Sequence, residues 1–450
     1  MTRFFSPPSQ RTTAIVASAL FVLFAAWDVL AIRATLPRAL FGDEWRYLYY
    51  AKNLLQGFYS PRDRVFLWNG PGYPLLLAPF VRADWIDGAR YANAFLHAAA
   101  LVYAWLTLAP RLGSLAGVAA VFLLGCYGPI AEHLPLLYTE VACFFLVAAW
   151  VHHALECRRS RAHRIASGVY LGLLCLTKVV FGVALMAFLV AVLVARRFWR
   201  DSQLTFHLAP VLLAFALCTP YLAYTYRLTG RPLYWSSAGG FAFYWLTSPY
   251  PEEWGDAYHQ GWVHQNPILR AHHGEIIDRT SGIADDPDLP VEEQVFNIST
   301  PESGDLYLRR GIENVRGHPR KFFRNWCANV ARLFFDVPVS VRGTPFWNGC
   351  TAYHLPLLVF GAAVALYARR KRVAISPAWT PIWLWGAISF GVYSFGSSAA
   401  RYLIPLVPIG WLGSWAWLAR AVRAPSPATA DSAEGVTDDQ RPPPRERPPI

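Results

Sequence analysis

The sequence has little charge and almost no lysine or methionine. Of its 450 residues, 16% are charged, 54% are hydrophobic and 15% are aromatic, with 19 tryptophans and two methionines. Soluble domains carry about 25% charged residues, so this composition excludes an ordinary soluble protein. It indicates an all-α polytopic membrane protein built of spanning helices. Lysine occurs at only four positions, which makes a lysine within an apolar region informative.

The sequence also lacks a basic stripe and a cysteine framework. Its formal net charge is +12, but the arginines cluster in short segments between apolar runs, so nucleic-acid binding is not expected. The seven cysteines show no metal-binding or disulfide spacing, and whether Cys327 and Cys350 pair is left open. The N-terminal apolar run lacks a small-residue cleavage site and is interpreted as a retained span.

The apolar segments predict about ten membrane spans. They cover residues 12–32, 89–108, 114–130, 138–155, two spans within 165–195, then 204–226, 351–367, 378–395 and 402–418. The segment 165–195 is divided because Lys178 at the bilayer centre would cost about 2.5–3.5 kcal/mol, whereas two spans meeting there avoid that cost. With this count the arginine-rich segments 158–164, 196–200 and 369–372 all face the cytoplasm, as topology signals do.

The same reading divides the chain into four parts. Residues 1–226 form a transmembrane module with a catalytic first outer loop at 34–87, and residues 227–350 form a large extracytoplasmic loop. Residues 351–420 form C-terminal transmembrane helices, and 421–450 a disordered cytoplasmic tail. Short interfacial helices are expected at 47–55 and 73–80, separated by Gly70-Pro71-Gly72. One or two further helices are expected at 306–335.

Asp43 and Glu44 are adjacent carboxylates beside the outer membrane face. Such groups are costly there unless water, a cation or a substrate meets them. Adjacent helical residues point about 100° apart, so only one of the two is expected to face a site. That one can serve as a general base. The alternative is an acidic cap favoured by the dipole of the following helix.

Three other charged residues are predicted to face the same side. Glu140 lies at the outer end of a span, where it is either a second site carboxylate or a helix-end charge. Lys178 is either a partner for a carboxylate or lipid phosphate, or a polar break between spans. Arg401 opposes the positive-inside bias, which favours a partner over a topology signal.

A metal site is not defined by the sequence. Histidines cluster in the large loop near Glu275, at positions 259, 264, 272 and 273. Their spacing matches no zinc pattern, and adjacent His272 and His273 do not easily bind one ion. No cofactor is certain, and a divalent cation stays open.

The order of several short motifs resembles that of a known family. They are Asp43-Glu44, the segment 47–57, Pro71-Gly72-Tyr73-Pro74, Arg90 with Asn93, Tyr138-Thr139-Glu140, Thr177-Lys178, Gly317-His318-Pro319 and the segment 401–408. Together they cover most of residues 10–420. The pattern resembles the GT-C membrane glycosyltransferases, in the branch of the protein O-mannosyltransferases and the lipid A aminoarabinose transferase.

This resemblance implies a GT-C-type bundle in the plasma or inner membrane with an extracytoplasmic active site. The reaction would be an inverting transfer of a sugar from a polyprenyl-phosphate donor to a lipid, glycan or protein acceptor. Asp43 would be the base, supported by Glu44. The residues expected to bind substrate are Glu140, Lys178, Arg401, Tyr73 and Arg90. Of these, Lys178 and Arg401 are candidates for the donor phosphate because fixed cations stabilise a leaving phosphate.

Two other classes of function are alternatives to this one. A transporter or flippase of a lipid-linked or anionic substrate would be expected to show inverted repeats and charges near mid-depth. The sequence shows no convincing repeat, and its charged residues gather on one predicted side. The third possibility is a scaffold for envelope assembly. The Asp43-Glu44 pair argues against it.

Overall fold

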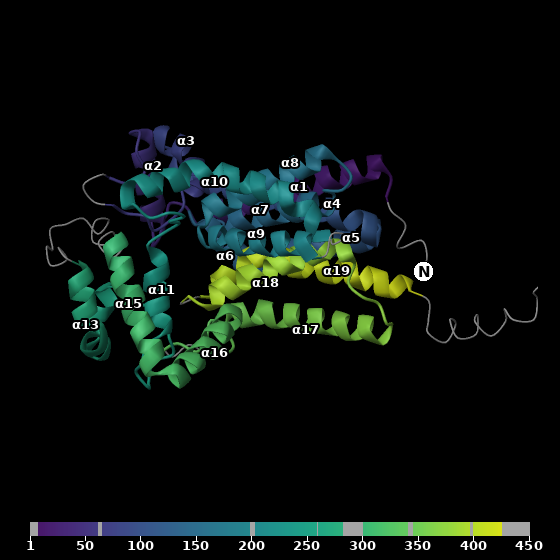
Figure 1. Ribbon diagram of the computed structural model, residues 1–450. Helices are drawn as coiled ribbons and strands as arrows, with labels where there is room; N and C mark the ends of the chain where they lie inside the picture. The colour runs from purple at the N-terminus through teal and green to yellow at the C-terminus, as the bar shows by residue number, and fades with distance from the viewer. Residues whose placement is uncertain are drawn as a thin grey trace, which may run out of the picture.

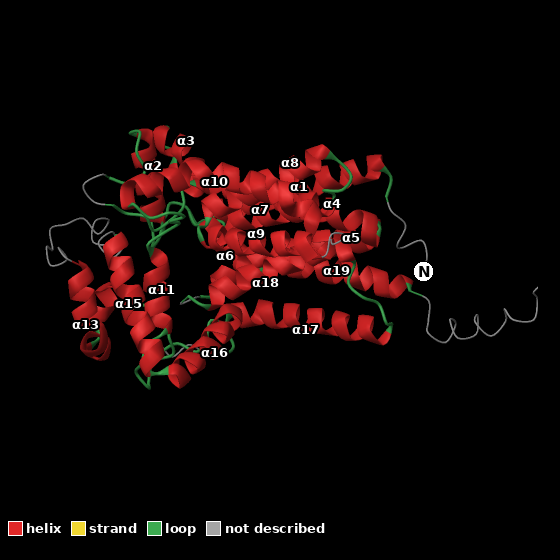
Figure 2. Ribbon diagram, in the orientation of Figure 1, coloured by secondary structure: helices red, strands yellow, loops and turns green. Residues whose placement is uncertain are grey.

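The computed structural model describes residues 8–61, 65–198, 203–258, 260–281, 300–340, 345–396 and 399–424. Every regular element in these ranges is helical (Figure 2). Most of the predicted disordered tail lies outside the described residues. The last helix, α19 (Val407–Arg423), continues three residues past the predicted start of that tail.

A bundle of apolar helices forms the body of the protein (Figure 1). Besides α19, its members are α1 (Gln10–Arg33), α4 (Ile86–Leu112), α5 (Ser114–Gly125), α7 (Thr139–Leu155), α8 (Arg161–Thr177), α9 (Val180–Phe198), α10 (Leu208–Thr229), α17 (Gly349–Arg370) and α18 (Thr380–Ser394). Each predicted span falls on one of these helices. In the described part of the chain, six helical segments are long and apolar enough to cross a membrane, so the number of spans stays a prediction.

Small residues allow close packing within the bundle. On α8, a Cβ added at Gly168 would lie 2.8 Å from the carbonyl oxygen of Pro210 on α10. In lipid there is no hydrophobic driving force for helices to associate, so spanning helices associate through close backbone packing of this kind. The largest side chains fill the remaining core, where the indoles of Trp150 and Trp385 lie 5.6 Å apart and are fully buried.

The break at Lys178 is where the first outer loop docks. As predicted, α8 ends at Thr177 and α9 begins at Val180. A Cβ on Gly72 would lie 2.7 Å from the amide nitrogen of Thr177, and one on Gly70 would clash with the Leu176 carbonyl. The glycines therefore bring this loop against the break. The contact lies at the start of α3 (Gly72–Arg82), and the helix before it along the chain is α2 (Glu44–Leu55).

The large loop folds as a helical unit at the same end of the bundle (Figure 1). It contains α11 (Ala238–Leu246), α12 (Gln260–Gln265), α13 (Pro267–Ser281), α15 (Pro301–Gly317) and α16 (Pro319–Phe335). Two helices, α15 and α16, occupy the region where one or two were predicted. The unit has its own core around Trp245 and Tyr307. The Ser237 amide donates to the Leu67 carbonyl at 2.8 Å, which joins it to the first outer loop.

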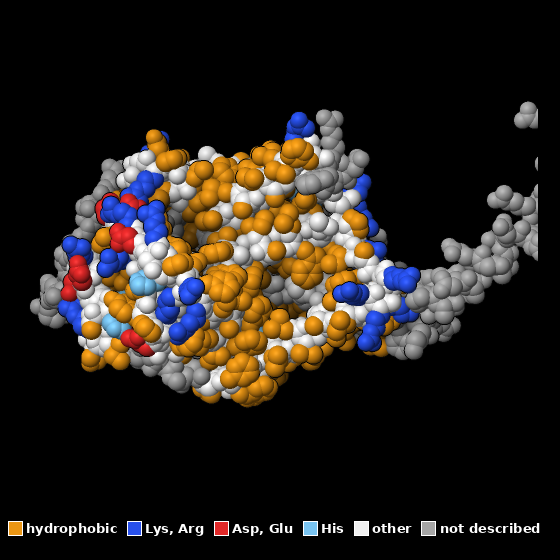
Figure 3. Space-filling view, turned by 60° about the horizontal axis from the view of Figure 1, so that its bottom comes forward, with side chains coloured by type: hydrophobic (Ala, Val, Ile, Leu, Met, Phe, Trp, Pro, Cys, Tyr) orange, Lys and Arg blue, Asp and Glu red, His pale blue; other side chains and the backbone are white. Residues whose placement is uncertain are grey.

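The surface matches a protein that crosses a membrane. Apolar side chains cover the bundle in a continuous band, and charged side chains gather at its two ends (Figure 3). One charged end contains Arg369 and Arg370 in the last turn of α17. The thiols of Cys327 and Cys350 are both free.

Candidate active site

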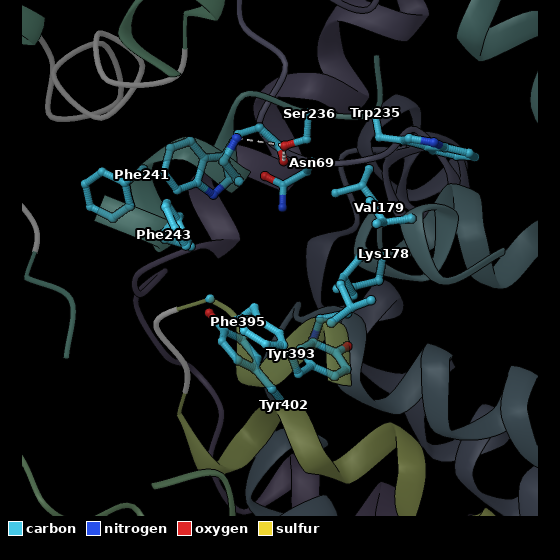
Figure 4. A pocket seen from close by; sticks show the side chains of 18 of the residues that line it. Asn69, Lys178, Val179, Trp235, Ser236, Phe241, Phe243, Tyr393, Phe395 and Tyr402 are labelled. Carbon is cyan, nitrogen blue, oxygen red and sulfur yellow. Dashed lines mark hydrogen bonds between the residues drawn. The ribbon is translucent and has the colours of Figure 1, made fainter. Parts of the chain in front are cut away.

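A cavity of about 1250 Å³ lies between the bundle and the large-loop unit. Four of the charged residues singled out from the sequence line it: Asp43, Glu140, Lys178 and Arg401. They come from the first outer loop, the start of α7, the α8–α9 break and the short 3₁₀ helix Ala400–Leu406. In Figure 4, Tyr393, Phe395 and Tyr402 lie across the cavity from Asn69 and Ser236.

Asp43 precedes α2 and turns its carboxylate toward the cavity. Its Oδ2 accepts a hydrogen bond of 2.8 Å from Nη2 of Arg401, and its Oδ1 lies 3.5 Å from Nη1 of Arg46. The side chain is 27% exposed and makes no hydrogen bond to the helix amides, so it does not cap α2. Burial acts to raise the pKa of Asp43, but Arg401 and Arg46 outweigh it, and the pKa falls below 3.8.

Glu44 points the opposite way and is fully buried. Its two carboxylate oxygens accept from the amides of Phe41 at 2.7 Å and Leu137 at 2.9 Å. Glu44 does not line the cavity. Glu44 is therefore a positioning residue, because its hydrogen bonds join the segment that carries Asp43 to the segment before α7.

Glu140 and Lys178 form an ion pair on the cavity wall. Nζ of Lys178 lies 3.0 Å from Oε1 of Glu140, and Nε of Arg401 lies 3.9 Å from the same oxygen. Lys178 also stands 4.8 Å from the ring centre of Tyr402, a distance at which a cation and an aromatic face attract. Carboxylates and cations therefore alternate along the wall from Asp43 through Arg401 and Glu140 to Lys178.

Arg90 and Tyr73 were predicted to bind substrate, but neither lines the cavity. Arg90 is buried, with Nη1 donating to Asp87 at 2.8 Å and Nη2 lying 3.6 Å from Glu44. Tyr73 is buried with its ring edge against Tyr47 at 5.1 Å. Tyr73 therefore packs behind Tyr47, which lines the cavity, whereas the partners of Arg90 do not line it. The motif resemblance carries position along the chain and not the direction of a side chain.

The large loop contributes lining residues that the sequence did not single out. Asp256 accepts hydrogen bonds from the Ser340 amide at 3.0 and 3.1 Å, and it lies 3.9 Å from Arg332 of α16. Asp336 accepts from the amide of Ala400 at 3.3 Å, next to Arg401, and burial raises its pKa. One residue could have pointed to this group: Arg332 is a basic residue on the face of the amphipathic helix α16 that is buried in the structure.

One side of the cavity is apolar and runs along the bundle. It is lined by Val180, Val183 and Met186 of α9 and by Ile388 and Val392 of α18. These two helices pack against each other. The cavity therefore combines a charged end with an apolar side of the kind a lipid chain occupies.

Comparison with known proteins gives a likeness in fold only. No family model and no curated protein matches the sequence. Among solved structures, the chain is similar to the archaeal oligosaccharyltransferase AglB from Archaeoglobus fulgidus in complex with an inhibitory peptide and a dolichol-phosphate. The identity is 14% and the TM-score 0.48, covering 90% of this chain and 50% of that one.

It is also similar to ArnT from Cupriavidus metallidurans bound to undecaprenyl phosphate, with 14% identity and a TM-score of 0.41, covering 87% of this chain and 77% of that one. Both neighbours are GT-C superfamily members. The chain spans about half the length of the oligosaccharyltransferase. Likeness at this identity concerns the course of the helices and not the reaction.

Proposed function

We propose that the protein is an inverting glycosyltransferase that uses a polyprenyl-phosphate-linked sugar as donor. One observation carries the proposal: Asp43 faces a cavity that also holds two fixed cations and an apolar side. A base, a phosphate site and a lipid groove are the three parts that such a transfer requires. The acceptor would be a lipid, glycan or protein on the extracytoplasmic side of a plasma or inner membrane.

The donor phosphate is assigned to Lys178 and Arg401. Both line the cavity beside its apolar side, where the polyprenyl chain would lie. Fixed cations at this position stabilise the negative charge that grows on the phosphate as the sugar leaves. Arginine suits this task because its planar donors bind phosphate oxygens in pairs.

Asp43 is assigned as the general base. It takes the proton from the acceptor hydroxyl or amine while the acceptor lone pair forms a bond to the anomeric carbon. The bond from that carbon to the phosphate oxygen breaks, and its electron pair leaves with the polyprenyl phosphate. Attack from the face opposite the phosphate inverts the configuration at the anomeric carbon.

Arg401 links the two events because it holds Asp43 at 2.8 Å in the structure. A donor phosphate that draws Arg401 away would remove the interaction that lowers the pKa of Asp43, so the carboxylate would become a stronger base once donor is bound. Glu140 lies within reach of both cations and would keep them in place during this exchange.

The arrangement favours this function over transport. Glu140 stands in the first turn of α7, and Lys178 directly follows the last residue of α8. Both therefore sit at helix ends, whereas transporters keep such charges near mid-depth.

The test is binding of undecaprenyl phosphate and of undecaprenol, its uncharged counterpart, to the full-length protein in nanodiscs. Lys178→Met is expected to weaken binding of the phosphate at least tenfold and to leave undecaprenol binding unchanged. Lys52→Met is the control, because Lys52 is exposed on α2 and does not line the cavity. Equal phosphate affinity in wild type and Lys178→Met would refute the assignment.

A further inference from the structure

A second cluster of chemically active side chains lies in the large-loop unit, outside the cavity lining. It joins Glu253, in the segment between α11 and α12, to His272 and His273 of α13. One ligand atom from each of the three residues lies within 4.8 Å of the other two. The sequence had associated the two histidines with Glu275, but Glu275 is exposed and pairs with Arg279 at 3.4 Å.

The three side chains converge on one point. Oε1 of Glu253 lies 2.8 Å from Nδ1 of His272 and 3.0 Å from Nε2 of His273. Tetrahedral zinc with bonds of about 2.0–2.1 Å separates its ligand atoms by about 3.3 Å. Both carboxylate-to-imidazole distances are a few tenths of an ångström shorter than this separation, and all three ligand atoms lie within 4.8 Å of one another. The adjacent histidines reach one point by using different ring nitrogens.

The surrounding groups hold each ligand in orientation. Tyr244 Oη lies 2.7 Å from Nδ1 of His273, and Ser248 Oγ donates to Oε2 of Glu253 at 2.5 Å. The ring of Tyr250 stacks on His272 at 3.6 Å with an interplanar angle of 5°. Such outer partners fix the tautomer and the ring direction of metal-binding histidines.

The cluster is enclosed on one side and reachable on the other. Glu253 and His273 are 3% and 1% exposed. His272 is less buried, and its Nε2 faces the half-exposed Glu252 at 3.3 Å. An ion can therefore enter from the solvent, while the carboxylate and one imidazole exclude water from the inner half of its shell.

We propose that Glu253, His272 and His273 bind a zinc ion, with the fourth position open to water. Two imidazoles and a carboxylate form a donor set that favours zinc over magnesium or calcium. The ion would clamp the segment before α12 to α13. That segment also carries Asp256 into the cavity, so the zinc would stabilise one wall of the candidate active site.

The test is metal analysis of the purified full-length protein after exposure to zinc and removal of unbound ion. Wild type and His264→Ala are expected to retain stoichiometric zinc, because His264 contacts Arg270 and lies outside the cluster. Glu253→Gln and His272→Gln are each expected to lose the zinc. His272→Gln serves as the second variant if Glu253→Gln fails to fold. Zinc should raise the thermal midpoint of wild type and not of either cluster variant.

Three results would overturn the proposal. One is zinc retention in Glu253→Gln and His272→Gln equal to that of wild type. Another is loss of zinc in His163→Ala with retention in the Glu253 variant, since that would place the ion at the partly buried cluster of His152, His153 and His163. Absence of bound zinc in wild type refutes it as well.

Discussion

Arg401 donates a hydrogen bond of 2.8 Å to Asp43, although 358 residues separate them along the chain. The contact joins the first outer loop to the segment before the last helix of the bundle. It places the proposed base beside one of the two cations assigned to the donor phosphate.

Replacing Asp43 with asparagine is expected to lower sugar transfer by about 10²–10⁴-fold, the contribution of a general base. The amide keeps the size of the side chain but cannot take a proton. The measurement is transfer from the native lipid-linked donor in isolated membranes. Asp84→Asn is the matched control, because Asp84 is an exposed acid near the end of the same loop with φ of 49°, which asparagine tolerates. Full activity in Asp43→Asn would disprove the catalytic assignment.

Glu44→Gln is expected to destabilise the fold by about 1–3 kcal/mol, because one of two buried backbone amides would then face an NH₂ group and lose its acceptor. Thermal unfolding in detergent measures the change. Glu275→Gln, an exposed carboxylate on α13, is the control and should leave the midpoint unchanged. If Glu44→Gln removed activity with no loss of stability, Glu44 would have a direct catalytic role instead.

The stability that Asp43 contributes is expected to depend on pH in a defined window. The folded pKa lies below the ordinary value of 3.8, because the attraction of Arg401 and Arg46 exceeds the cost of burial. The contribution is therefore full above pH 3.8 and is lost as the pH falls from there through the folded pKa. The difference in thermal midpoint between wild type and Asp43→Asn should be constant from pH 7 to pH 5 and shrink below pH 3.8. A difference that already shrinks between pH 7 and pH 5 would contradict the lowered pKa.

Gly72→Ala is expected to displace the first outer loop from the α8–α9 break. The added methyl group would lie 2.7 Å from the backbone nitrogen of Thr177, which cannot move away as a flexible side chain does. Overpacking of this kind costs about 1–3 kcal/mol, and transfer activity should fall with it. Gly410→Ala is the control, since nothing lies within 4 Å of its added Cβ on α19. Equal stability of the two variants would show that the loop does not depend on this contact.

The sequence determined the features that depend on neighbouring residues. Hydropathy along the chain placed the helices of the bundle, and the cost of a lysine in lipid located the break at Lys178. The 100° angle between adjacent helical residues predicted that only one of Asp43 and Glu44 would face the site. In the structure Asp43 lines the cavity, whereas Glu44 is buried and does not.

Tertiary structure alone decided which distant groups meet. The Asp43–Arg401 contact, the burial of Arg90 behind the wall and the approach of Glu253 to His272 and His273 all depend on how separate helices pack. Hydropathy is a property of consecutive residues, so it can be determined from the local sequence. Ion pairs and ligand clusters depend on the direction of side chains from segments far apart, and that direction is fixed only when the chain has folded.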